Sequence, residues 1–126
     1  MREDLPQIIK EVGFDFSWDE KKVWQLDVPV TEMNLSELEW HFDIPFLWWG
    51  RGIYNLTPRT VMEKPADYPK EYERTMKADI KFPIDIMENK GRWLILDGLH
   101  RLMRLYVLGE KKIRVRIISR DRIADI

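Results

Sequence analysis

Cysteine is absent from this 126-residue chain, and histidine occurs only twice, as His41 and His100. The absence of cysteine excludes disulfides, thiolate metal sites and a cysteine nucleophile, and it agrees with a reducing compartment. Long apolar runs are also absent: none approaches the ~20 residues of a membrane span, and the charged N-terminus does not resemble a signal peptide. We therefore expect a soluble, cytoplasmic protein with no membrane partner.

The composition is otherwise that of a globular domain. Hydrophobic residues make up 44% of the chain, which includes six tryptophans. A chain of this length can bury one sizeable core and is too short for two domains. We therefore predict a single domain over residues 1–126.

Charge is distributed unevenly along the chain. The segment 90–122 holds ten Lys or Arg against three Asp or Glu, a balance of +7, and the rest of the chain carries −8. Cations that share one face would attract anions there. The alternative is that Arg114 and Arg116 only line the solvent side of a strand.

The first half of the chain shows weaker patterns than the second. Aromatic and aliphatic residues alternate within 14–28, which predicts a β-hairpin, although Ser17 and Glu20 have the spacing of a helix cap. A helix of about two turns is predicted after Asn34 or Ser36, either of which suits an N-cap.

The middle of the chain is harder to interpret. Residues 42–69 contain four prolines and no sustained period. A loop of this length is usually functional or contains hidden structure, and Thr57 with Pro58 could open a short helix. A clearer amphipathic helix is predicted from Pro69 to about Asp79.

From residue 82 onward the pattern is regular. We predict a strand over 83–87, a turn over 88–91 and a second strand over 92–97 that is apolar on both faces. An amphipathic helix then begins at Leu99 and ends before Gly109, and a third strand follows over 112–119.

The step from strand to helix at Asp97-Gly98 concentrates unusual residues. His100 and Arg101 fall in the first turn of the predicted helix. The first turn of a helix presents backbone N–H groups without partners, and the helix dipole adds partial positive charge there. This corner is therefore a candidate anion site.

The run from Pro83 to Ile118 resembles the core of the ParB/sulfiredoxin superfamily, which includes ParB-like nuclease domains. The resemblance lies in a buried strand, an Asp-Gly-x-His-Arg turn, a helix, a glycine and a basic closing strand. Residues 26–40 loosely resemble the family's opening strand and helix. The resemblance implies an α+β fold, a small mixed sheet with helices, of the ParB/sulfiredoxin-like type.

The resemblance also implies a nucleotide whose phosphates lie at the helix N-terminus, with Mg²⁺ and ATP, ADP or CTP as expected cofactors. Carried onto this chain, Gly98 allows close approach of the backbone, and His100 and Arg101 supply donors. Asp97 orients His100, binds Mg²⁺ or caps the helix, and we favour capping.

Departures from the motif distinguish branches of the family. Sulfiredoxin carries its reactive cysteine where this chain has Leu99, so sulfiredoxin chemistry is excluded. Partitioning ParB proteins have Gly-Glu-Arg-Arg at the corner and continue into a helix-turn-helix domain, whereas this sequence reads Gly-Leu-His-Arg and ends at Ile126, so we expect no full partitioning protein. The free-serine kinase branch, Asp-Gly-His-His-Arg, differs only at Leu99.

The kinase branch has a catalytic carboxylate after its first strand. Glu32 is the nearest counterpart here, with Glu37 and Glu39 as alternatives. The resemblance therefore implies Glu32, Asp97 and His100 as the catalytic residues, and it requires Glu32 to lie within one substrate of His100.

Two other constellations are less specific. His41 has Glu39 and Asp43 nearby, but the two histidines lack metal-ligand spacing, so we expect a structural or surface histidine and no metal site. Trp48 and Trp49 are candidates for stacking on a base, although burial is the commoner fate of tryptophan.

Three functions remain open at this point. The first is a nucleotide-binding protein that uses the 97–101 corner and acts as a phosphotransferase on a small hydroxyl compound. The second is a ParB-like DNA-associated module, a nuclease or a nonspecific binder, which needs the arginines of the basic segment on one surface. These are Arg101, Arg104, Arg114, Arg116 and Arg120. The third is a non-catalytic interaction domain.

Overall fold

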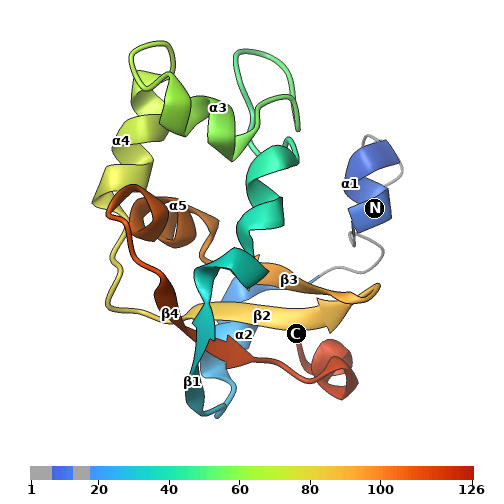
Figure 1. Cartoon of the computed structure of the whole chain (residues 1–126). Coiled ribbons are helices and arrows are strands. Elements are labelled where there is room, and N and C mark those ends of the chain that lie inside the picture. Colours follow the sequence, from blue (N-terminus) through green and yellow to red (C-terminus); the bar gives the residue numbers. More distant parts are fainter. Residues whose placement is uncertain (1–6, 13–17) are drawn as a thin grey trace.

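The computed structural model of the chain describes residues 7–12 and 18–126 (Figure 1). Four strands form one sheet in the order β1-β4-β2-β3. Their bounds are β1 Val30–Asn34, β2 Ile84–Asn89, β3 Arg92–Asp97 and β4 Lys112–Ile117. β2 is parallel to β4, whereas the β1–β4 and β2–β3 pairs are antiparallel. The predicted α+β class, with a small mixed sheet and helices, is therefore confirmed.

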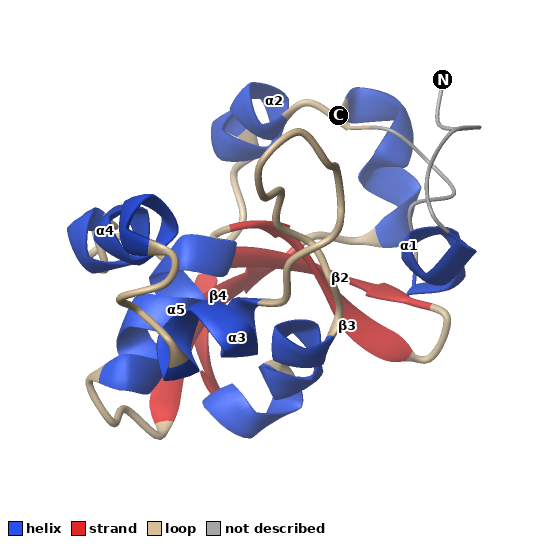
Figure 2. Cartoon of the chain, turned by 90° about the horizontal axis from the view of Figure 1, so that it is seen from above, coloured by secondary structure: helices blue, strands red, loops and turns tan. Residues whose placement is uncertain are grey.

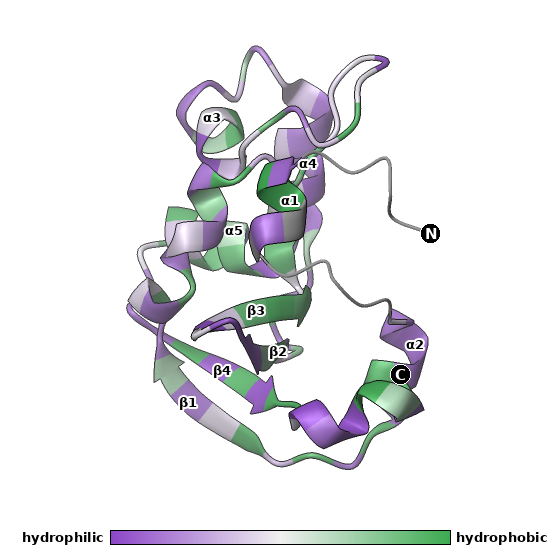
Figure 3. Ribbon diagram, turned by 90° about the vertical axis from the view of Figure 1, so that its right-hand side faces the viewer, coloured by the Kyte–Doolittle hydropathy of each residue, from purple (hydrophilic) through white to green (hydrophobic). Residues whose placement is uncertain are grey.

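Helices cover both faces of this sheet (Figures 1 and 3). One face carries α3, α4 and α5, with α4 beside α5 (Figure 2), and the other carries α2 and the C-terminal segment. The α-helices are α1 Gln7–Val12, α2 Glu20–Gln25, α3 Pro58–Glu63, α4 Pro69–Lys77 and α5 Leu99–Val107, and the 3-10 helices are η1 Leu35–Glu37, η2 Glu39–Asp43 and η3 Arg120–Asp125. In the described part of the chain, no helix has the length and apolar character needed to cross a membrane.

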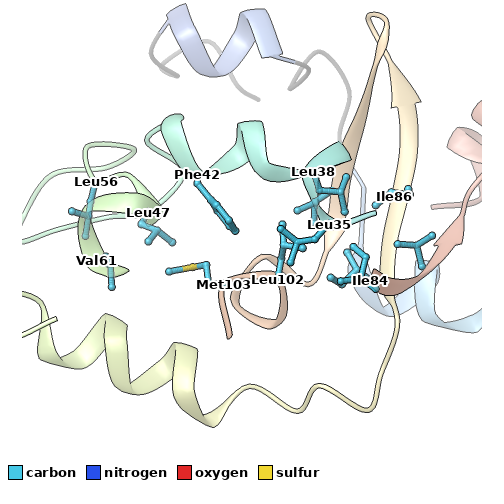
Figure 4. Close-up of a cluster of buried hydrophobic side chains, with 13 residues drawn as sticks. Leu35, Leu38, Phe42, Leu47, Leu56, Val61, Ile84, Ile86, Leu102 and Met103 are labelled. Carbon is cyan, nitrogen blue, oxygen red and sulfur yellow. The ribbon is translucent and has the colours of Figure 1, made fainter. Parts of the chain in front are cut away.

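Two hydrophobic cores lie on opposite faces of the sheet. The first packs η2, α3 and α5 against β2 and β4, with Phe42, Leu102 and Ile84 fully buried (Figure 4). The second lies between α2 and the sheet, where Val23 packs with Met87 and Ile118. Because each core uses one face of the same strands, a change in β2 or β3 affects both cores.

β3 shows this double burial most clearly. Leu94 and Leu96 pack in the second core, whereas Ile95 packs in the first, where Trp93 contacts it. The strand is hydrophobic in its middle, over residues 94–96, and Figure 3 shows the green of this part. The prediction of a strand covered on both faces is confirmed, because a strand with no polar face needs two apolar partners.

The predicted β-hairpin over 14–28 is wrong in its described part. Residues 20–25 form α2, whose N-cap is Asp19, and the Asp19 carboxylate accepts a hydrogen bond from Lys21 N at 2.9 Å. Helical turns bury Val23 and leave Trp24 exposed, which alternation did not anticipate. Phe14 and Phe16, the other half of the expected hairpin, lie outside the described residues.

The helix predicted after Asn34 has a different form. Two 3-10 helices, η1 and η2, meet at Leu38, and the Asn34 side chain makes no capping hydrogen bond. Leu35, Leu38 and Phe42 all point into the first core. Burial of these three side chains, rather than a cap, holds the segment.

Other local predictions are confirmed. Thr57 caps α3, with its hydroxyl accepting from Thr60 N, and Pro69 opens α4. The β2–β3 hairpin turns at Lys90 and Gly91, which both have positive φ, as a two-residue hairpin with the right-handed twist of strands requires. Gly109 follows α5 at φ 83°.

Candidate functional site

Gly98 joins β3 to α5 and is the N-cap of the helix. Its φ of 116° is a conformation that side chains disfavour, and a Cβ there would lie 3.1 Å from Ile84 Cγ1. Glycine has no side chain to cap a helix, so the N–H groups of the first turn of α5 face outward without a side-chain cap. The sequence requires glycine at this corner for both conformation and packing.

Asp97 does not cap α5, contrary to the favoured prediction. Its Oδ2 atom accepts hydrogen bonds from Arg101 Nη2 and from Trp24 Nε1, each at 2.6 Å. Arg101 also donates to the carbonyl oxygen of Pro83. Asp97 and Arg101 therefore form a partly buried ion pair that ties α2 and the start of β2 to the corner.

His100 is paired with a carboxylate that sequence analysis missed. Its Nε2 atom lies 3.0 Å from Glu71 Oε2, and the two side chains are only 22% and 15% exposed. Glu71 belongs to the first turn of α4, and α4 packs beside α5 (Figure 2). The one signal in the sequence was an acidic residue early in a well-predicted helix, but the partner depends on how the two helices pack.

The corner opens into a cleft of about 570 Å³. The cleft runs along β3, which is an edge strand of the sheet, and its wall includes the exposed ring of Trp48. This volume is in the range of small-molecule sites. The residues that line it are Trp18, Glu20, His41, Phe46, Trp48, Tyr54, Ala78, Asp79, Phe82, Ile95, Leu96 and the whole corner from Asp97 to Arg101.

The loop that contains Trp48 is held by its own hydrogen bonds. Leu47 and Leu56 form an antiparallel bridge, and the Asn55 side chain bonds both backbone groups of Trp49. Trp48 packs edge to face against Tyr54, with ring centroids 5.7 Å apart. Of the two predicted stacking candidates, Trp48 lines the cleft, whereas Trp49 packs against Tyr68.

His41 is a structural histidine at the back of the cleft. Its Nε2 atom accepts a hydrogen bond from Ile95 N at 3.0 Å, and its Nδ1 atom donates to Leu38 O at 2.8 Å. Burial, aided by the nearby charge of Arg92, lowers the pKa of His41 to about 4, although the bond to Leu38 acts in the opposite direction. At this open edge of β3, the His41 imidazole therefore accepts the hydrogen bond that a neighbouring strand would otherwise accept from Ile95 N.

The structure does not bring Glu32 to the corner. Glu32 lies in the middle of β1, opposite Arg114, rather than after the strand. Its neighbour Met33 packs against the first core, on the face that carries α5. Because side chains alternate along a strand, Glu32 points to the opposite face of the sheet. The geometric requirement for Glu32 as the base beside His100 is not met.

The arginines of the basic segment do not form one open surface. Each donates to at least one backbone carbonyl: Arg101 to Pro83, Arg104 to Ala78, Arg114 to Lys81, Arg116 to Val23 and Leu26, and Arg120 to Glu88. Arg114 and Arg116 are on the α2 face of the sheet, whereas Arg104 belongs to α5 on the other. These five arginines connect different segments of the chain through their hydrogen bonds. The excess of positive charge in segment 90–122 therefore does not produce one continuous phosphate-binding surface.

The described residues offer no cluster of three or more His, Asp or Glu that could hold a metal ion by themselves. The cleft wall nevertheless contains the carboxylates of Glu20 and Asp79 in addition to Asp97. These residues fit Mg²⁺ only as a counter-ion shared with the phosphates of a ligand, since Mg²⁺ in such sites keeps few protein ligands.

Comparisons of the chain with protein-family models, with curated proteins and with solved structures found no match.

Proposed function

We propose that this protein binds a nucleotide, with the phosphates at the N-terminus of α5. The observation that carries the proposal is the opening of an uncapped, glycine-started helix into a cleft of small-molecule size. Three carboxylates line the same cleft, so a bare polyphosphate would be repelled and its Mg²⁺ complex is the favoured ligand.

The fold supports a ParB/sulfiredoxin-like assignment as part of this proposal. The β2–β3 hairpin, the Gly98 corner, α5 and the parallel return strand β4 follow one another in the order that the motif implies. The loop at Trp48 and the α2 segment are additional elements around the same corner. The assignment rests on this order and on the Asp-Gly-x-His-Arg motif.

The experiment that tests the proposal is calorimetric titration with ATP, ADP, CTP and GTP, each with and without Mg²⁺, and with duplex DNA. We expect a nucleotide to bind more tightly with Mg²⁺ and to be displaced by the Mg²⁺ complex of tripolyphosphate, which is the form used wherever tripolyphosphate is tested. Arg101→Gln should weaken binding, and Arg122→Gln is the control, because Arg122 forms an ion pair with Asp125 and lines neither cavity.

Failure of every nucleotide to bind would refute the proposal, as would equal affinities of the two arginine variants. Binding of DNA alone, with a steep loss at higher salt, would favour the DNA-associated alternative instead. The engagement of all five arginines by backbone carbonyls argues against that outcome.

The His100–Glu71 pair favours phosphotransfer as a second candidate function. A carboxylate at Nε2 leaves Nδ1 of His100 as the atom that could take the proton of an acceptor hydroxyl, and Glu71 would stabilise the resulting imidazolium. In this scheme Glu71 takes the place that the resemblance gave to Glu32. The test is transfer of labelled γ-phosphate from ATP to a panel of small hydroxyl compounds.

A further inference from the structure

A second cavity, of about 450 Å³, adjoins the cleft. Phe82 and Arg101 line both cavities, so the two share a wall. The remaining lining of the second cavity comes from α2, from the start of β2 and from β4. These residues are Trp24, Pro83, Asp85 and Arg116.

Two exposed aromatic rings line this second cavity. Trp24 is 56% exposed and Phe82 is 57% exposed, and neither belongs to the hydrophobic cores. A single exposed aromatic residue is ordinary, but two on the wall of one cavity form an apolar surface that a ligand could cover.

Hydrogen bonds hold the Trp24 ring and the backbone on either side of Phe82 in place. The Trp24 indole N–H donates to Asp97 at 2.6 Å. The carbonyl groups on either side of Phe82, those of Lys81 and Pro83, accept from Arg114 and Arg101. The Trp24 ring and the backbone that carries Phe82 are therefore preorganised, which lowers the entropic cost of packing a ligand there.

The polar part of the cavity is close to neutral. A register shift in the β2–β3 ladder places Asp97 directly opposite Asp85, a pairing of like charges that would be unfavourable by itself. Arg101 lies 2.6 Å from Asp97 and Arg116 lies 2.7 Å from Asp85, so each carboxylate has its own guanidinium. The lining therefore offers planar hydrogen-bonding groups without the excess positive charge that would select a phosphate.

We propose that the second cavity binds a planar heteroaromatic ring, of nucleobase size, packed against Phe82 and Trp24. Aromatic side chains stack on such rings with little dependence on sequence, and a guanidinium plane adds a further stacking surface. The link to the corner rests on the proposed function: because Phe82 and Arg101 border both cavities, the ring belongs to the molecule whose phosphates lie at Gly98.

The test separates the ring from the phosphates. Affinities of adenosine, cytidine, ATP, CTP and tripolyphosphate are measured for the wild type and for Phe82→Ala, Phe82→Leu, Trp24→Ala, Trp48→Ala and Trp49→Ala. We expect both Phe82 variants to weaken nucleosides and nucleotides about tenfold or more and to leave tripolyphosphate unchanged. Trp24→Ala, which changes the second cavity alone, should weaken nucleosides in the same way, and Trp48→Ala tests the first cleft as the alternative site of the ring. Trp49→Ala, which removes a half-exposed ring that lines neither cavity, is the matched control and should have little effect.

Each other outcome has a defined meaning. If Trp48→Ala weakens nucleosides and the Phe82 variants do not, the ring lies in the first cleft and the assignment is overturned. Absence of any nucleoside binding overturns it as well. If nucleosides bind in a Phe82-dependent way but tripolyphosphate does not bind, the phosphate site fails and the ring site stands. Phe82→Leu keeps apolar bulk at the position, and its melting temperature shows whether a loss of binding reflects folding.

Discussion

The two histidines of the chain occupy contrasting environments around one cleft. His41 is 1% exposed and stacks on Trp40 with ring centroids 3.8 Å apart, and both of its ring nitrogens hydrogen-bond to the backbone. His100 is partly exposed and faces a carboxylate, Glu71, at 3.0 Å. The first arrangement fixes the edge of the sheet, and the second leaves a titratable group in reach of a ligand.

This contrast shows that the residue type alone does not decide the environment of a histidine. Burial keeps His41 neutral, because the charged form would lose its hydration. His100 lies at the start of α5, is partly exposed and faces the carboxylate of Glu71. The difference is therefore one of solvent access and of partner.

Replacement of His41 tests the structural half of the comparison and should have the largest effect. His41→Ala leaves the Ile95 N–H and the Leu38 carbonyl without partners and opens a cavity beside Trp40. We expect a loss of about 2–4 kcal/mol in the free energy of unfolding, measured by urea denaturation. His100→Ala is the matched control, and an equal loss in both variants would erase the contrast.

The pH dependence of stability sharpens the same comparison. In the unfolded chain His41 takes up a proton near pH 6.5, whereas in the folded protein its pKa is about 4. Acid therefore favours unfolding. Neutral His41 makes its full contribution to the free energy of unfolding above pH 6.5, and this contribution falls by up to about 3 kcal/mol as the pH drops from 6.5 to 4. Denaturation curves across this range should show the slope in the wild type and a smaller slope in His41→Gln.

The functional half of the comparison predicts smaller changes in stability. His100→Gln keeps an amide N–H that can still donate to the Glu71 carboxylate, so we expect a loss of less than about 1 kcal/mol in unfolding experiments. Nucleotide affinity should fall severalfold in the same variant, because position 100 lines the cleft. A variant with wild-type affinity would remove His100 from the binding site.

Glu71→Gln should change stability least of all. The amide can still hydrogen-bond His100, so we expect a change within about 0.5 kcal/mol. If the protein transfers phosphate, turnover should fall while nucleotide affinity stays close to that of the wild type, because the carboxylate acts on the acceptor proton. Equal turnover in Glu71→Gln and Glu32→Gln would contradict the assignment of Glu71.

Much of the fold was predictable where local patterns and burial agree. Alternation and the Lys90-Gly91 turn identified the β2–β3 hairpin, and the apolar run from Trp93 to Leu96 identified a strand buried on both faces. The α2 segment was mispredicted because its aromatic residues alternate by chance, while Asp19 and the burial of Val23 select a helix.

The candidate site was predictable only at its corner. Gly98 and the start of α5 follow from residues adjacent in the chain. Glu71, 29 positions before His100, could not be inferred, because the contact depends on how α4 packs beside α5. The prediction of Glu32 as the base was wrong for a similar reason. It placed Glu32 after a strand, whereas Glu32 lies within β1, and the position in the strand decides which face of the sheet its side chain occupies.

The sequence by itself determined the strands after residue 82, the amphipathic helices and the glycine corner, since these depend on hydrophobic period, on turn chemistry and on the backbone freedom of glycine. Only the tertiary structure decided which charges meet. Three pairs depend on it: Asp97 with Arg101, Asp85 with Arg116 and His100 with Glu71. It also places arginines of the basic segment where they donate to backbone carbonyls. The physical reason is that an electrostatic contact depends on distance in space and on burial, and neither is a property of neighbouring residues in the chain.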